Sequence, residues 1–366
     1  MLKTLNNRNR IFGLDLLRAF AILFVMWGHG NMLLRHYVLD SWIYLIAFDG
    51  VSIFFVLSGF LIGGIWLRLI NQSEVSLKSI WQFWLRRWFR TLPNYYLILT
   101  ILAILSVIFR DFRLSDALPY YGFVQNVNWV HPPFFAEAWS LSIEEWFYLL
   151  LPLLFLVFSY VSGKSRQYSM LFVIVFVILF SSVLRYLRAN EMGDLDFILW
   201  DDYFRRQVFT RLDSIMYGVL GAYMAYYSPN IWRRHRKLSL VIGLILIIDY
   251  QWVATDNFLS NSTFGLYFQV FSFAQISIGT LLLMPFLSSW KGSGRPWQKV
   301  FVFISLTSYS LYLVNSFLVL GFIIPALKIE SIWLQYLLFW VASVLIATLI
   351  YKYYEVPTTK LRDRFS

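Results

Sequence analysis

The sequence predicts an all-α polytopic membrane protein, a bundle of about ten transmembrane helices. Three observations support this prediction. The chain is 59% hydrophobic and only 14% charged, whereas soluble domains carry about a quarter charged residues. Long apolar runs recur from end to end, without the two-residue alternation of an outer-membrane barrel. Basic residues gather in alternate connecting segments, as they do in membrane proteins with many spans.

Each predicted span is long and apolar enough to cross a bilayer as a helix. In chain order, the spans cover residues 12–34, 43–67, 91–109, 139–161, 169–187, 208–228, 238–255, 264–288, 300–324 and 332–352. In the sixth span, Gly218 and Ala222 predict close packing against a neighbouring helix. The basic N-terminus lacks the cleavage pattern of a signal peptide, so the first span is predicted to be retained. We expect a single integral-membrane domain over residues 1–366, with no appended soluble domain.

Basic residues predict the topology. With the N-terminus in the cytoplasm, the cytoplasmic segments hold 21 of the 31 lysines and arginines, so both termini are predicted to be cytoplasmic. This bias accounts for most of the net charge of +11, and no nucleic-acid partner is predicted. The chain has no cysteine, which excludes a thiolate nucleophile and a thiolate metal site. Its four histidines lack metal-ligand spacing, so no metal is predicted. Among them, His131 in the outer segment is a candidate acceptor contact.

The first span carries two ionisable residues on one face. Arg18 and His29 are eleven residues apart, which on a helix places them within about 20° of each other and about 16 Å apart along the axis. Ionisable residues at membrane depth are costly and usually functional. A reactant anchored by Arg18 and reacting at His29 fits this pattern. The alternative is a snorkelling arginine beside a hydrogen-bonded core histidine.

Two further charged groups lie near the cytoplasmic ends of the first and third spans. Asp15 is three residues before Arg18, and a pairing of the two is the more ordinary interpretation. Arg86, Arg87 and Arg90 precede the third span, where forked guanidinium donors could bind phosphate oxygens. The alternative for this arginine cluster is an ordinary positive flank that touches lipid headgroups.

A polar stripe enters the fourth span from outside. Ser140, Glu144 and Tyr148 recur every four residues on an otherwise apolar helix. Glu144 either orients a substrate hydroxyl or the imidazole, or makes a structural hydrogen bond. In the sixth span, Arg211 and Asp213 either form a local ion pair or touch an acceptor.

Taken together, these segments resemble the acyltransferase 3 family of bacterial membrane acyltransferases. The resemblance extends over the whole chain, and each motif is short, but their order and topology agree. The resembling segments are Arg18 with His29, residues 50–62, Arg87-x-x-Arg90-x-x-Pro93, Trp139-Ser-Leu-Ser-Ile-Glu144 with Phe147-Tyr148, Arg211-x-Asp213 with Gly218, residues 308–313, and Glu355-x-Pro357.

The resemblance implies O-acyl transfer in the bacterial inner membrane. The donor would be cytoplasmic acyl-coenzyme A, most simply acetyl-CoA, and the acceptor a hydroxyl of a cell-surface or periplasmic saccharide. We expect His29 and Glu144 to be catalytic. His29 acts either as general base or as acyl carrier. The residues expected to bind the donor are Arg18, Arg86, Arg87 and Arg90. The residues expected to bind the substrate are Asp15, Trp139, Ser140, Tyr148, Arg211 and Asp213.

Two positions depart from the family pattern. Many relatives carry histidine where this chain has Asn315, and many carry aspartate where it has Ser52. Some relatives append a periplasmic hydrolase-like domain, and because the sequence ends at Ser366 such a partner is expected to be a separate chain. Two rival functions remain: a transporter or flippase of a lipid-linked saccharide, and a non-catalytic scaffold of a polysaccharide assembly.

Overall fold

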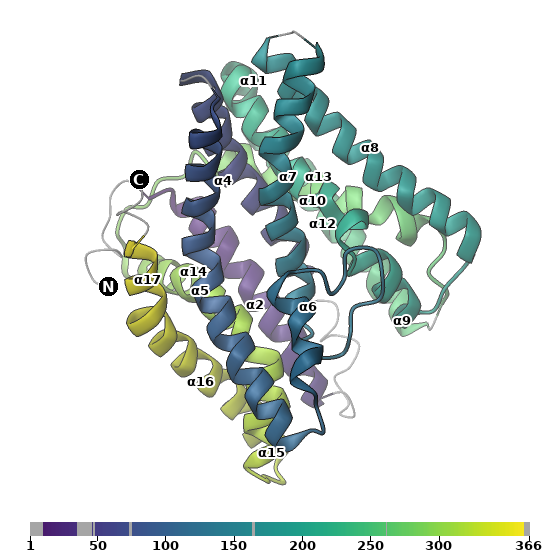
Figure 1. Cartoon of the computed structure of the whole chain (residues 1–366), viewed down its shortest axis with the longest axis vertical. Coiled ribbons are helices and arrows are strands. Elements are labelled where there is room, and N and C mark those ends of the chain that lie inside the picture. Colours follow the sequence, from purple (N-terminus) through teal and green to yellow (C-terminus); the bar gives the residue numbers. More distant parts are fainter. Residues whose placement is uncertain are drawn as a thin grey trace.

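The computed structural model describes residues 10–34, 46, 48–72, 75–162, 165–260 and 262–361. Long helices cross the molecule with alternating direction, and short helices cover the connections (Figure 1). The elements are α2 (Phe12–Leu34), α4 (Gly50–Gln72), α5 (Leu77–Phe109), η1 (Leu114–Ala117), α6 (Leu118–Tyr121), α7 (Ala138–Ser162), α8 (Arg166–Met192), α9 (Phe197–Trp200), η2 (Asp201–Arg205), α10 (Val208–Tyr227), α11 (Pro229–Arg234), α12 (Arg236–Leu259), η3 (Tyr267–Phe271), α13 (Ser272–Leu287), α14 (Pro296–Val314), η4 (Asn315–Ile323), α15 (Ile324–Ala326), α16 (Ile332–Ile350), η5 (Tyr351–Glu355) and α17 (Val356–Leu361).

The predicted membrane bundle is confirmed. Within the described ranges, nine helices are long and apolar enough to cross a membrane. The sixth predicted span is also a helix, α10, but its Arg, Asp and tyrosine residues lower its mean hydropathy. Helix α10 is buried on nearly all sides by its neighbours, and a helix screened from lipid need not be apolar all round. Part of the second predicted span, and the predicted cytoplasmic residues Lys3, Arg8, Lys164, Arg362 and Arg364, lie outside the described ranges.

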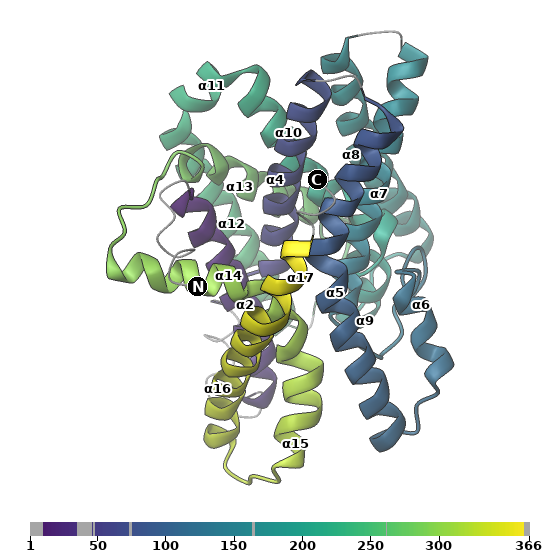
Figure 2. The same ribbon diagram turned by 60° about the vertical axis from the view of Figure 1, so that its left-hand side comes forward.

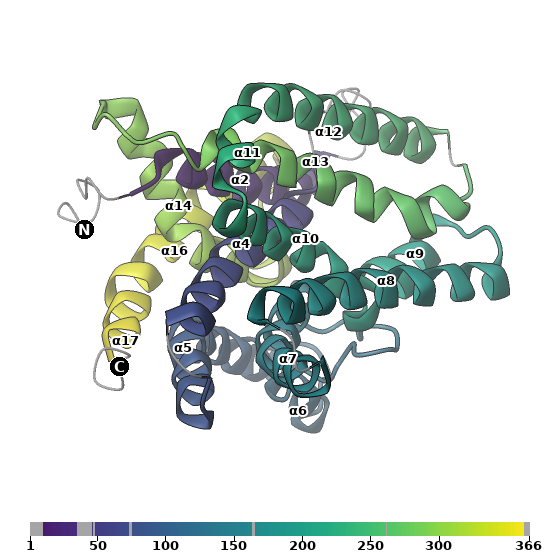
Figure 3. The same cartoon turned by 90° about the horizontal axis from the view of Figure 1, so that it is seen from above.

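Helices α4 and α10 pack side by side in the middle of the bundle (Figure 3). Their backbones approach so closely that a Cβ atom on Gly218 would overlap the carbonyl of Val56, and one on Gly59 would overlap that of Ile215. The predicted packing surface around Gly218 is therefore confirmed, with α4 as its partner. This contact fixes α4, which lines both of the cavities described below.

Helix α5 is much longer than a bilayer requires. Its 33 residues span about 50 Å, against about 30 Å of hydrocarbon. It begins at a capping box in which Ser76 and Ser79 exchange side-chain-to-backbone hydrogen bonds. Its first turns run alongside the C-terminal part of α4, and its middle lies near α17 (Figure 2). The arginines that precede the third predicted span are thus held on a rigid helix and not on a loop.

The helices differ in how much of their surface is covered. Of its spanning window, the segment that ends in α13 is 67% buried, whereas the α16 segment is only 17% buried. The exposed side chains of α16, such as Leu337 and Leu345, are apolar, as expected of a helix that faces lipid. The polar and charged side chains described next therefore lie on the inner helices.

Candidate active site

A cavity of about 300 Å³ lies between α2, α4, α5, α7 and α14. We call it the arginine cavity because the guanidinium groups of Arg18, Arg68, Arg87 and Arg90 line it. It extends along α4 from Arg68 to Val51, which on an ideal helix is about 26 Å. Its length suits an extended ligand, and its cations suit a ligand with phosphate groups.

The structure brings six of the predicted site residues together in this cavity. They are Arg18, Arg87, Arg90, Ser140, Glu144 and Tyr148. Arg86 is exposed and lines neither cavity, although on a helix it lies only about 40° around from Arg90. Arg68, which sequence reasoning treated only as a topology signal, lines the cavity from α4.

Glu144 belongs to the arginine cavity and does not contact the imidazole of His29. The Tyr148 hydroxyl donates to Oε2 of Glu144 at 3.2 Å and lies 2.9 Å from the Ser58 hydroxyl. Arg18 and Arg90 interact with Glu144 electrostatically. The structure therefore gives no support to the alternative in which Glu144 orients the imidazole, since this carboxylate lies among the arginines.

Asp15 does not pair with Arg18, contrary to the more ordinary interpretation. Its carboxylate forms an ion pair with Arg10, which donates through both Nε and Nη2. The Ser305 hydroxyl of α14 also donates to it at 2.8 Å. Arg10 precedes α2 and can direct its fork at the carboxylate, a geometry that a neighbour one turn along the helix does not offer. Asp15 lines neither cavity, so its predicted substrate contact has no support.

A second cavity, of about 580 Å³, contains His29. We call it the histidine cavity. Helix α2 contributes His29, the loop before α7 contributes Glu137, and the first turn of α7 contributes Trp139. Trp139, a predicted substrate contact, packs its ring 5.0 Å from the guanidinium carbon of Arg205. Further lining residues are Asp49, Trp200, Asp201, Arg206, Tyr250, Phe264, Phe268, Tyr312 and Ser316.

Asn315 fixes the tautomer of His29. The Nδ2 group of Asn315 donates to the carbonyls of Leu311 and Tyr312 at 2.8 and 3.0 Å, so its Oδ1 faces the imidazole. That oxygen lies 2.5 Å from Nδ1 of His29. Since an amide oxygen only accepts, neutral His29 carries its proton on Nδ1. The lone pair of Nε2 is therefore available to a reactant.

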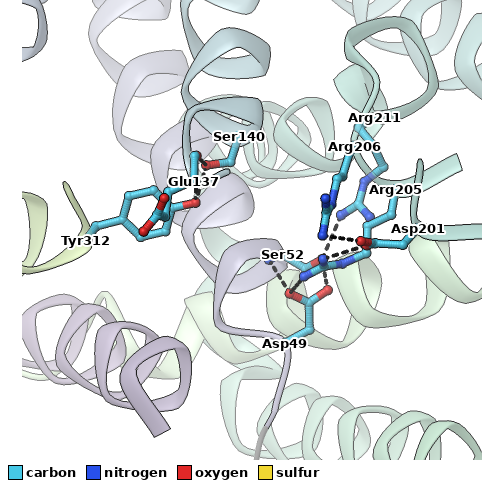
Figure 4. Close-up of polar contacts among 9 residues, drawn as sticks. All are labelled: Asp49, Ser52, Glu137, Ser140, Asp201, Arg205, Arg206, Arg211 and Tyr312. Carbon is cyan, nitrogen blue, oxygen red and sulfur yellow. Dashed lines mark hydrogen bonds and ion pairs between the residues drawn. The ribbon is translucent and has the colours of Figure 1, made fainter. Parts of the chain in front are cut away.

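The two cavities share part of their wall. Val51 and Tyr312 line both of them. The Tyr312 hydroxyl lies 2.6 Å from the hydroxyl of Ser140 and donates to the backbone carbonyl of Glu137 at 3.1 Å (Figure 4). Ser140 lines the arginine cavity and Glu137 the histidine cavity. The ring of Tyr312 thus lies in the wall between the two cavities, and its hydroxyl contacts one lining residue of each cavity.

The cations of the histidine cavity are paired. Arg205 donates to Asp201 at 2.9 Å and lies 3.7 Å from Asp49, and Arg206 lies 2.5 Å from Asp201. Asp49 accepts from both the backbone N–H and the hydroxyl of Ser52, at 3.1 and 2.7 Å. Asp49 therefore holds a carboxylate against Ser52, the position at which many relatives are expected to carry an aspartate (Figure 4).

Arg211 and Asp213 do not form the predicted local ion pair. Asp213 pairs with Arg185 of α8 at 2.6 Å, and both side chains are fully buried. Arg211 donates to the Ser52 hydroxyl at 2.7 Å and lies over the ring of Phe273. Neither predicted substrate contact lines a cavity. Residues two apart on a helix point to different sides, so each finds its partner on a different neighbouring helix.

His131 is buried in the loop between α6 and α7 and lines neither cavity. Its ring meets that of Tyr120 edge to face at 5.5 Å. Burial, together with the nearby charge of Arg206, lowers the pKa of His131 to about 3. Its neutral, enclosed ring gives no support to the predicted acceptor contact.

Sequence reasoning missed three residues of the histidine cavity region. Asn315 was recognised only as a departure from the family pattern, although its position implied a partner for His29. Asp49 directly precedes the second-span motif, and Glu137 is two residues before Trp139, so both lay beside recognised motifs. Within the described ranges, no group of three His, Asp or Glu side chains is arranged to hold a metal ion.

Comparisons with known proteins agree with this architecture. Three relatives are informative. Peptidoglycan O-acetyltransferase OatA of Listeria monocytogenes is 34% identical over 42% of this chain and 25% of its own length. O-acetyltransferase OatA of Staphylococcus aureus is 27% identical over 95% of this chain and 57% of its own length. The putative peptidoglycan O-acetyltransferase YrhL of Bacillus subtilis is 33% identical over 50% of this chain and 29% of its own length.

The chain thus covers between a quarter and somewhat more than half of the length of these relatives. No solved structure matches it significantly. The sequence profile described as acyltransferase domain, the acyltransferase 3 family, matches residues 11–352. That range contains Arg18, His29, Glu144 and every lining residue of the two cavities except Glu355. The chain belongs to the acyltransferase 3 family.

Proposed function

We propose that this membrane protein transfers an acyl group, most simply acetyl, from acyl-CoA in the arginine cavity to a saccharide hydroxyl in the histidine cavity. The observation that carries the proposal is the arrangement of the two cavities, which share Val51 and Tyr312. Arginines line the cavity on one side of this boundary, and His29, whose Nδ1 is bound to Asn315, lies on the other side. The names of the relatives support an O-acetyl group and a peptidoglycan acceptor.

Coenzyme A fits the arginine cavity by its chemistry. Its nucleotide end carries several phosphate charges, and its thioester is at the end of a long thin arm. Arg68, Arg87 and Arg90 would bind the phosphates near the ends of α4 and α5 that the charge pattern places in the cytoplasm. The arm would then run along α4, past Arg18, to Val51. Its thioester would reach the boundary beside Tyr312.

Two routes use the same lone pair of His29. In the first, Nε2 removes the proton of the acceptor hydroxyl while that oxygen attacks the thioester carbonyl, and coenzyme A leaves as a thiolate that is then protonated. In the second, Nε2 attacks the thioester carbonyl and expels coenzyme A as a thiolate; the acceptor oxygen then attacks the acyl-histidine, the imidazole leaves, and the hydroxyl proton passes to the freed Nε2. In both routes Asn315 holds the ring and stabilises charge on it through Nδ1–H.

The test is acyl-CoA turnover by the purified full chain in lipid nanodiscs. We expect release of free coenzyme A together with acylation of added peptidoglycan oligosaccharide. Isotope in the acyl group follows the transfer directly. Movement of saccharide across a proteoliposome without thioester cleavage would favour the transporter alternative. The absence of both thioester cleavage and saccharide movement would favour a scaffold. Either of these two results would overturn the proposed function.

A further inference from the structure

Glu137 is a buried carboxylate in the histidine cavity. It directly precedes α7, is only 3% exposed, and lines the cavity together with His29. Its Oε1 accepts a hydrogen bond from the backbone N–H of Phe317 at 2.7 Å. Its backbone carbonyl accepts from the hydroxyls of Tyr312 and Ser140 (Figure 4). Both the main chain and the side chain of Glu137 are therefore held in place.

One short segment positions both Glu137 and His29. The π-helical segment η4 begins at Asn315, whose Oδ1 binds the imidazole of His29. Two residues later, the N–H of Phe317 binds Glu137. Ser316, between them, lines the same cavity. The carboxylate and the imidazole are thus fixed relative to each other by a few atoms of rigid backbone, as two groups that act on one ligand should be.

The second oxygen of this carboxylate has no partner among the residues that the structure describes. Within the described ranges, Oε2 of Glu137 accepts no hydrogen bond, and the carboxylate forms no ion pair. Burial of an unsatisfied charged oxygen is unfavourable. The cations Arg205 and Arg206 of the same cavity are paired with Asp201. This oxygen therefore keeps an unused acceptor site on a residue that lines the histidine cavity.

We propose that Oε2 of Glu137 accepts a hydrogen bond from a second hydroxyl of the acceptor, next to the hydroxyl that His29 acts on. This proposal rests on the proposed function and names a specificity determinant within it. An ionised carboxylate only accepts hydrogen bonds, so it favours a polyhydroxylated acceptor over a simple alcohol. The aromatic rings of Trp139, Trp200 and Tyr250 in the same wall offer flat apolar faces for the C–H side of a pyranose ring.

Glu137→Gln isolates the proposed contact. Glutamine can keep its Oε1 as acceptor for the Phe317 N–H, while an NH₂ group replaces Oε2 and presents donors to the acceptor hydroxyl. The probes are the methyl glycoside of N-acetylglucosamine and its monodeoxy analogues, with isotope-labelled acetyl-CoA. We expect the KM of the parent glycoside to rise about 10- to 150-fold, the range for a hydrogen bond to a charged group, while the KM of acetyl-CoA stays the same.

The monodeoxy analogues identify the hydroxyl. One analogue should lose affinity with the wild-type chain and should then show little further loss with Glu137→Gln, because the two changes remove the same contact. The matched control is Glu330→Gln, an exposed glutamate in the loop between α15 and α16, which should behave as wild type. If Glu137→Gln fails to fold, Glu137→Asp, which keeps the charge but withdraws it by one methylene, should show the same pattern at the same analogue.

Three outcomes would overturn the inference. They are an unchanged glycoside KM in Glu137→Gln, an equal loss on every analogue, and a wild-type protein that transfers acetyl to peptidoglycan but neither binds nor acylates the glycoside. The failure of the proposed function is a different result, in which the wild-type chain cleaves no acyl-CoA with any acceptor. The two failures are therefore distinguishable.

Discussion

The two cavities differ in whether their arginines form ion pairs. In the arginine cavity, Arg18, Arg68 and Arg90 form no ion pair within the described ranges. In the histidine cavity, Arg205 and Arg206 are both paired with Asp201. Cations without partners attract a polyanion, whereas neutralised cations provide hydrogen-bonding walls without net attraction. The difference indicates which substrate each cavity suits: the charged donor on one side and a neutral, hydroxylated acceptor on the other.

The cavities also differ in shape. The arginine cavity is the smaller, about 300 Å³, and follows one helix for most of its length. The histidine cavity is about 580 Å³ and is surrounded by aromatic residues. A narrow channel aligns a flexible arm, because it leaves the arm few conformations. A wider chamber admits a bulky ring. Among the described residues, Val51 and Tyr312 line both cavities, and this shared wall is where the proposed transfer would take place.

The most general prediction concerns the sides of the membrane to which the two cavities belong. A label placed in residues 233–237, between α11 and α12, should be accessible from the cytoplasm. A label at residues 256–260, at the far end of α12, should be accessible from the periplasm. Membrane-impermeant thiol reagents on single-cysteine variants can check this, since the chain has no cysteine of its own. Both labels on the same side would refute the topology and with it the assignment of donor and acceptor sides.

The largest catalytic effect should come from the histidine cavity. His29→Ala removes both the general base and the acyl carrier, so transfer should fall by at least about 10³-fold. Donor affinity should remain, because the arginines are unchanged. Coenzyme A release and labelled acceptor are the measurements, and His235→Ala, at the exposed loop before α12, is the control. Near-normal turnover in folded His29→Ala would exclude both proposed routes.

Removing the partner that holds the imidazole of His29 should reduce transfer, but less than removing the imidazole itself. Asn315→Ala removes the acceptor for Nδ1–H of His29, so the neutral ring can place its proton on either nitrogen and can rotate. Transfer should fall about 10²-fold, as expected when a catalytic histidine loses its orienting partner. The loss should appear in kcat and not in the KM of acyl-CoA. An equal change in both constants would indicate a general disturbance of η4 instead.

The helices could be predicted from the sequence, but the partners of individual side chains in the two cavities could not. Apolar runs were sufficient to predict the membrane-spanning helices, nine of which are confirmed within the described ranges, whereas the arginine cluster was predicted with Arg86, which does not line the arginine cavity. These patterns did not reveal which neighbour each side chain meets. Asp15 pairs with Arg10, and Glu144 faces the arginines and not His29. These outcomes depend on how helices rotate against one another, and short polar contacts between distant segments, such as His29 with Asn315, leave no periodic signal.

In the arginine cavity, the geometry of the guanidinium should matter as well as its charge. Arg87→Lys or Arg90→Lys keeps the positive charge but loses the forked donors, so acyl-CoA affinity should fall about 10- to 150-fold. Acceptor KM should barely change, because the acceptor occupies the other cavity. Arg86→Lys is a matched control on the same helix, since Arg86 is exposed and lines neither cavity. Wild-type donor affinity in both variants would mean that these arginines are only a positive flank.

The smallest effect should appear at the boundary between the cavities. Tyr312→Phe removes the hydroxyl that bonds to Ser140 and to the carbonyl of Glu137, while the ring itself remains. Each neutral hydrogen bond contributes about 0.5–1.5 kcal/mol of stability. Without the hydroxyl, the observed orientation of the ring at position 312 should therefore become about 2- to 10-fold less populated. Water should then reach the thioester more often. We expect acceptor-independent release of coenzyme A to rise by that factor.

Tyr309→Phe is the control, because it deletes the same group from the same helix. Tyr309 lines only the arginine cavity and donates to the Thr91 carbonyl, so its loss should leave this hydrolysis unchanged. Equal hydrolysis in the two variants would mean that the Tyr312 hydroxyl does not separate the cavities, and that the shared wall depends on the bulk of the ring and of Val51 alone.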